Sequence, residues 1–207
     1  MSGEYAKLSF NAVRNHIDTG DQIAFCGRGL ISSTIKFFRS LFSLKIIRVT
    51  HIAVVYDKNK LVEVTTIGFK PYAIKRDIED AIASYKGDIY ILPLARRYRD
   101  LGREAFARNW LDQIAEEKVG YDYWQMLRSA ITTWWKTKES KKRLYCSELG
   151  AWVLKIMCLV NLNASEVPPD VLIRFKVYAP TYWCVKGSGK PLKYYNTLEP
   201  EGYGYAH

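Results

Sequence analysis

The chain has 207 residues, of which 48% are hydrophobic and 14% aromatic, so its composition favours one globular domain with a sizeable core and excludes a disordered chain. The longest apolar stretches, such as 156–160, are far shorter than the roughly 20 residues that a membrane-spanning helix needs. Lysine and arginine outnumber aspartate and glutamate by 31 to 21, which gives a net charge of +10. This excess favours an anionic partner such as nucleic acid, phospholipid headgroups or cell-wall polymer.

The first half of the chain predicts a short helix followed by a strand and a hairpin. Apolar residues at helical spacing indicate a helix over 5–17, and "QIAFC" predicts a strand over 22–26. Residues 30–44 form a basic amphipathic stretch that either roofs a pocket or contacts a membrane. Two β-branched runs, 50–57 and 60–66, are separated by a polar turn and predict an antiparallel hairpin.

The second half predicts mainly helices. "GDIYILPL" adds a strand near 89–94, and apolar residues at four-residue steps indicate helices over 103–118 and 124–135. A further buried helix face starts at Cys146 and continues to Val160. Helices first, then a hairpin-rich sheet, then helices describe an α+β domain.

The C-terminal part predicts one more strand and an arm. "VPPD" breaks the helical pattern, and "FKVYA" over 175–179 suggests a last strand. Residues 187–207, rich in glycine, proline and tyrosine, are typical of an extended arm that docks on a protein partner. We therefore expect a single domain over 1–186 followed by this arm.

Four cysteines, Cys26, Cys146, Cys158 and Cys184, occur without a CxxC pair or any zinc-ligand spacing, which disfavours a zinc site. The N-terminal stretch "MSGEYAKLSFNAVRNHI" has no signal peptide, so we expect a cytoplasmic protein or one delivered by another route. A reducing compartment favours free thiols over a disulfide framework.

Cys146 is the first candidate catalytic residue because it begins a predicted helix. The unpaired N–H groups and the positive end of the helix dipole stabilise a thiolate there. The same N–H groups can hold the oxyanion that forms when a carbonyl is attacked. The alternative is a buried core thiol, which is the commoner role of cysteine.

His51 and Glu63 are the candidates for a base and an orienting group. His51 opens the clearest strand, where a polar ring needs a partner, and it is either a core histidine bonded to a carbonyl or the general base for Cys146. Glu63 is the sole charge within "LVEVTT". An odd-length hairpin loop or a bulge puts Glu63 on the face of His51, whereas an even loop leaves it facing solvent.

The ordered set "TGDQIAF", "RGLISSTIKFF", "THIAVVYD", "LVEV", "GYDY", "YCSELGAWVL" and "VPPDVL" resembles the circularly permuted branch of the NlpC-type papain-like hydrolases, the YiiX and YaeF-like group. In this branch the histidine strand precedes the cysteine helix, as His51 precedes Cys146 here. The chain departs from the usual "HVGIV" by having "HIAVV", with Ala53 in place of the glycine.

The resemblance implies a cysteine amidase, endopeptidase or acyltransferase with Cys146 as nucleophile, His51 as base and Glu63 as the orienting residue. It implies a permuted papain-like fold, in which a curved antiparallel sheet packs on helices and the nucleophile lies at a helix N-terminus. It also implies that no metal or organic cofactor is needed. Peptidoglycan peptides and lipid acyl groups are both substrates in the wider superfamily. Virus-encoded relatives lack signal peptides, so delivery by a phage or virus particle is the second localisation that we expect.

Two other classes of function compete with the enzyme. The domain is alternatively a catalytically silent papain-like scaffold that serves as a binding or virion structural module. Nucleic-acid binding through the basic segment "KTKESKKR" is the least favoured, because no recognised nucleic-acid motif accompanies the charge.

Overall fold

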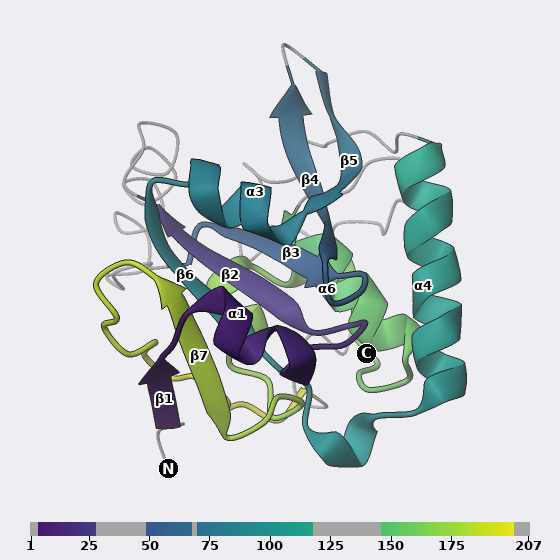
Figure 1. Ribbon diagram of the computed structural model, residues 1–207. Coiled ribbons are helices and arrows are strands. Elements are labelled where there is room, and N and C mark those ends of the chain that lie inside the picture. Colours follow the sequence, from purple (N-terminus) through teal and green to yellow (C-terminus); the bar gives the residue numbers. More distant parts are fainter. Residues whose placement is uncertain (1–3, 28–48, 68–69, 118–145, 201–207) are drawn as a thin grey trace.

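A computed structural model of the chain describes residues 4–27, 49–67, 70–117 and 146–200, and Figure 1 shows how their elements are arranged. A seven-stranded sheet runs in the order β1-β7-β6-β2-β3-β4-β5. Its strands are β1 (Glu4–Lys7), β2 (Gln22–Gly27), β3 (His51–Val55), β4 (Lys60–Ile67), β5 (Lys70–Asp77), β6 (Gly87–Leu92) and β7 (Thr181–Lys186). The β1–β7 pair is parallel and the other pairs are antiparallel, so the sheet is mixed.

Helices cover both faces of this sheet, which confirms the predicted α+β class. In chain order the α-helices are α1 (Phe10–Val13), α3 (Ile78–Ser84), α4 (Leu101–Glu116), α6 (Cys146–Ile156) and α7 (Pro169–Leu172). Short 3-10 helices occupy Arg14–His16, Arg96–Tyr98 and Ala164–Glu166. None of the helices in the described part of the chain is long and apolar enough to cross a membrane.

Two apolar layers hold these helices to the sheet, because successive strand residues point to opposite faces. On one face, residues such as Ile52, Val54 and Val62 pack with α6 and α4. On the other face, residues such as Ile23 and Phe25 pack with α1 and α3. Figure 1 shows α1 and α3 on the near side of the sheet and α6 on the far side. Each fully buried aliphatic side chain contributes about 1.5–3 kcal/mol to this packing.

The central elements confirm the sequence predictions. The strand predicted over 22–26, the hairpin of β3 and β4, the strand near residue 89 and the helix starting at Cys146 all occur. The helix predicted over 103–118 occurs as α4, starting two residues earlier at an Asp100 cap whose side chain accepts a hydrogen bond from the Arg103 N–H. The helix predicted over 124–135 and the amphipathic stretch 30–44 lie outside the described residues.

The helix predicted over 5–17 is wrong in its first half. Glu4–Lys7 instead forms β1, which pairs in parallel with β7. The Ser9 side chain caps α1 by accepting from the Ala12 N–H, and α1 extends only to Val13 before a 3-10 turn. The N-cap fixes the helix start at Phe10, since a capping residue has extended rather than helical backbone angles.

The C-terminal predictions also need correction. Residues 175–179 form only isolated bridges, Leu94↔Tyr178 and Phe175↔Leu198, and the strand follows later as β7. From Gly187 the chain was expected to be an extended arm, but its described part is packed on the domain. Leu192 and Tyr195 are buried in the core, because their large apolar side chains gain more from burial than from exposure.

Candidate active site

Cys146 occupies the position that the sequence predicts for it, at the start of α6, and its side chain is buried. Its sulfur accepts hydrogen bonds from the backbone N–H groups of Ile52 and Ser147. Pairing between β3 and β4 extends from Val55↔Leu61 to Ala53↔Glu63, so Ile52 lies one residue beyond the last paired position. The N-terminus of α6 therefore meets the sheet at the point where β3 and β4 cease to pair.

The close approach of α6 to the sheet depends on Gly150, one turn after Cys146. The Gln22 side chain on β2 donates to the Gly150 carbonyl at 3.1 Å and accepts from the Tyr178 hydroxyl at 2.8 Å. A Cβ at residue 150 would lie 2.8 Å from the Leu172 side chain and 3.1 Å from the Gln22 amide. Glycine at this position lets the helix lie against β2 and β3, which fixes where Cys146 sits.

His51 lies between Cys146 and Glu63. Its Nε2 is 2.8 Å from Oε2 of Glu63, and the ring also hydrogen-bonds the Cys146 thiol. Because Nε2 is taken by Glu63, Nδ1 is the ring nitrogen left to face the sulfur. The imidazole packs against the Phe25 ring at 5.3 Å between centroids, and 23% of its side chain remains exposed. The structure thus brings all three predicted site residues together.

Glu63 shares a sheet face with His51 because the hairpin loop has an odd length. Val55 pairs with Leu61, so five residues, an odd number, separate these two paired positions along the chain, and Glu63 pairs with Ala53, the residue two positions after His51. Residues two apart on a strand point to the same face. Glu63 is therefore not the outward-facing solvated glutamate of the alternative reading, and only 5% of the residue is exposed.

The pKa shifts at these residues have opposing causes. Burial favours neutral His51, but hydrogen bonds to Cys146 and Glu63 and their negative charges outweigh it and raise the pKa of His51 to about 10. Burial likewise favours the Cys146 thiol, but the His51 hydrogen bond, its positive charge and the two backbone N–H groups hold the pKa of Cys146 below its ordinary value. The arrangement therefore favours a thiolate–imidazolium pair.

Arg76 is a member of this cluster that the sequence analysis missed. Its Nη1 is 3.1 Å from Oε1 of Glu63, on the oxygen that His51 does not use. Burial favours the neutral form of Glu63, but His51 and Arg76 together keep the pKa of Glu63 below its ordinary value. The only sequence signal was a basic pair, Lys75 and Arg76, in a segment where no strand was predicted.

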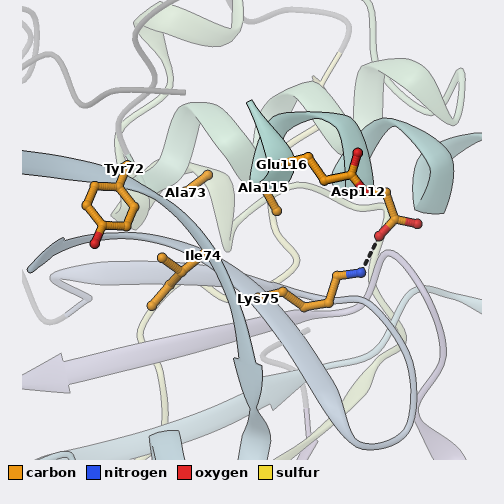
Figure 2. A pocket seen from close by; sticks show the side chains of 7 residues that line it. All are labelled: Tyr72, Ala73, Ile74, Lys75, Asp112, Ala115 and Glu116. Carbon is orange, nitrogen blue, oxygen red and sulfur yellow. Dashed lines mark hydrogen bonds and ion pairs between the residues drawn. The ribbon is translucent and has the colours of Figure 1, made fainter. Parts of the chain in front are cut away.

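A separate cavity of about 300 Å³ lies between β5 and α4 (Figure 2). It is lined by Tyr72, Ala73, Ile74, Lys75, Asp112, Ala115 and Glu116. In Figure 2 the Lys75 and Asp112 side chains point toward each other, and they form an ion pair. None of the three predicted site residues is among the described residues that line this cavity.

Within the described residues, no group of three or more histidine, cysteine, aspartate or glutamate side chains is arranged to hold a metal ion. The four cysteines are free thiols: Cys26, Cys146 and Cys184 are buried and Cys158 is exposed. The chemistry that the arrangement of Cys146, His51 and Glu63 supports is nucleophilic attack by the Cys146 sulfur.

In comparisons with known proteins, no protein-family model and no curated protein matches the chain. Function is therefore inferred from the geometry of the site.

Proposed function

We propose that the protein is a cysteine hydrolase, an amidase, endopeptidase or acyltransferase, that acts through a thioester on Cys146. The observation that carries the proposal is the position of His51, which hydrogen-bonds the buried Cys146 thiol on one side and the buried Glu63 carboxylate on the other. A core thiol needs no such partner. A nucleophile, a base and a group that orients the base are the parts that nucleophilic acyl transfer requires.

In the proposed reaction, the Cys146 thiolate attacks the carbonyl carbon of an amide or ester. The oxyanion is held by backbone N–H groups at the start of α6, which have no partner within the helix. As the carbon–nitrogen or carbon–oxygen bond breaks, His51 gives its proton to the leaving amine or alcohol and the thioester remains. Water then attacks the thioester and His51 takes a proton from that water. The carboxylic acid is released and the thiolate–imidazolium pair is regenerated.

We assign the fold to the permuted papain-like class as part of the same proposal. Its support is twofold. The histidine strand β3 precedes the cysteine helix α6 along the chain, and α6 packs on the sheet against β3. The substrate that we propose is a peptide or lipid acyl amide or ester on an anionic surface such as a cell wall or a membrane. The net charge of +10 supports an anionic surface but does not select between the two.

Trapping of the acyl-enzyme tests this proposal. The protein is mixed with a panel of p-nitrophenyl esters, from acetyl to longer acyl chains, and its intact mass is followed with time. We expect a single acyl adduct that maps to Cys146 and is cleaved by hydroxylamine, with a burst of nitrophenol. Cys146→Ser should lower turnover by about 10³-fold or more. When catalytic residues act as a unit, removing the nucleophile alone costs about as much activity as removing all of them.

A silent scaffold predicts a different result. In that case no adduct forms at Cys146 above the level seen at the exposed thiol of Cys158, and Cys146→Ser leaves the slow background unchanged. Either finding would replace the enzyme by a binding module built on the same fold.

A further inference from the structure

Arg76 is tied to the site at two points. One end of its guanidinium contacts Glu63 Oε1, and Nη2 donates to the Ser84 hydroxyl at 3.0 Å. Ser84 lies at the end of α3 and its hydroxyl donates to the Asp80 carbonyl at 2.7 Å. Since a planar guanidinium held at both ends has little rotational freedom, Arg76 presents one fixed geometry to the carboxylate.

The two oxygens of Glu63 are divided between two cations. Oε2 bonds His51 and Oε1 bonds Arg76, so rotation of the carboxylate would break both contacts. The side chain of Glu63 is 7% exposed whereas that of Arg76 is 31% exposed. A buried carboxylate with partners on both oxygens has its position and its charge fixed by them.

The two cations differ in one respect that matters for a catalytic cycle. His51 gives up its proton when the leaving group departs, and in that interval it no longer supplies a positive charge to Glu63. An arginine guanidinium is not deprotonated in proteins, so it supplies a positive charge throughout the cycle. Without Arg76, burial would favour protonation of Glu63 at the moment when His51 is neutral, and a protonated Glu63 no longer favours the imidazolium.

We propose that Arg76 is a positioning residue of the Cys146–His51–Glu63 site. Arg76 keeps Glu63 ionised and hydrogen-bonded to His51 through the whole reaction. This inference rests on the proposed function. Among the residues that the structure describes, the charged and titratable groups that act on Glu63 are His51 from β3 and Arg76 from β5, and Cys146 from α6 acts on His51.

The test compares Arg76→Gln, Arg76→Lys and Ser84→Ala with wild type. Lys75→Gln is the matched control, because it removes one positive charge from the neighbouring residue, whose partner is Asp112 rather than Glu63. Two measurements are made for each: kcat and KM on a p-nitrophenyl ester as functions of pH, and Cys146 alkylation by iodoacetamide as a function of pH.

We expect Arg76→Gln to lower kcat by about 10- to 100-fold with KM changed less than about twofold, as for other residues that orient a catalytic group. The acid limbs of both profiles should move to higher pH, because Glu63 is then protonated more easily. Arg76→Lys should restore the position of the acid limb but not all of kcat, and Ser84→Ala should produce a smaller shift in the same direction. Lys75→Gln should match wild type.

The inference is overturned if folded Arg76→Gln has the wild-type profiles while His51→Ala still abolishes the reactivity of Cys146. If circular dichroism shows that Arg76→Gln does not fold, Ser84→Ala decides: an unshifted profile overturns the inference and a shifted one supports it. If wild-type Cys146 has no reactivity that depends on His51, the proposed function itself has failed and the inference falls with it.

Discussion

Lys75 and Arg76 are neighbours on β5, and each pairs with a carboxylate, but the two ion pairs have different surroundings. Arg76 contacts a Glu63 side chain that is 7% exposed and that also holds His51. Lys75 contacts an Asp112 side chain that is 33% exposed, and this aspartate accepts from the Tyr56 hydroxyl at 2.8 Å. The alternation of a strand sends these adjacent cations to different clusters.

The two ion pairs differ in the third group that each carboxylate contacts. In both clusters a cation lowers the pKa of its carboxylate, so the shift alone does not distinguish them. What differs is the third group. Glu63 hydrogen-bonds an imidazole that lies beside a buried thiol, whereas Asp112 accepts a hydrogen bond from a tyrosine hydroxyl. Only the first cluster contains a nucleophile and a base.

The largest effect is expected from the centre of the buried cluster. His51→Ala should reduce ester hydrolysis by about 10²- to 10⁴-fold, the usual contribution of a general acid–base group. Tyr56→Phe, the corresponding change beside Asp112, should leave hydrolysis unchanged. A stopped-flow or plate assay with a p-nitrophenyl ester measures both, and equal losses in the two variants would contradict the distinction between the clusters.

The next effect comes from neutralising each carboxylate. Glu63→Gln should lower the free energy of unfolding by about 1–3 kcal/mol, because buried hydrogen bonds to charged groups are weakened. It should also reduce hydrolysis by about 10- to 100-fold. Asp112→Asn should cost no more than about 1 kcal/mol, as is usual for a half-exposed pair, and leave hydrolysis unchanged. Urea unfolding and the ester assay measure the two quantities, and the reverse ranking would count against the assignment of Glu63.

The pH dependence of stability gives a further effect with a definite sign. The folded-state pKa of His51 is raised from 6.5 to about 10, so its contribution to stability is complete below 6.5 and is lost as pH rises through about 10. The pKa of Glu63 is lowered, so its contribution is complete above its ordinary value of 4.5 and is lost at more acidic pH. The difference in unfolding free energy between wild type and His51→Ala should therefore be largest between pH 4.5 and pH 6.5, the ordinary pKa values of the two groups.

Urea unfolding of the two proteins at pH about 6 and at pH about 10.5 measures this difference. A stability difference that grows toward alkaline pH would show that His51 is not held protonated in the folded protein.

The smallest effect is expected at the surface pair. Lys75→Gln should change the free energy of unfolding by no more than about 1 kcal/mol, and high salt should remove even this difference. Its Cys146 alkylation profile should overlay that of wild type. A shifted profile would mean that general charge on β5, and not the contact of Arg76 with Glu63, controls the site.

The parts of the fold that the sequence predicted are those with strong apolar patterns. "QIAFC", "HIAVV" and the stripe after Cys146 supply buried residues at strand or helix spacing, and β2, β3 and α6 form there. The missed strands carry weak patterns. In β5, "KPYAIKRD" has one fully buried residue among 72–77, Ala73, because it lies at the edge of the sheet and pairs on one side only.

The site was predictable to the same extent. The positions of Cys146 and His51 were predictable because a helix start and a strand start are local features of the sequence. The face of Glu63 was not, because it depends on the pairing register, and register depends on the loop that connects β3 to β4. The contact of Arg76 with Glu63 could not be predicted from the sequence, because it depends on the pairing of β5 with β4 and on the packing of α3.

The most direct test of the central claim is the pH dependence of Cys146 alkylation by iodoacetamide, followed by mass spectrometry in wild type and His51→Ala, with Cys146→Ser as the control for assignment. We expect Cys146 to react rapidly well below the free-thiol pKa of about 8.5, and His51→Ala to remove this advantage. The exposed Cys158 serves as the reference thiol in the same sample. A Cys146 that stays inert, while Cys158, Cys26 or Cys184 reacts instead, would contradict the thiolate–imidazolium pair and the enzyme that we build on it.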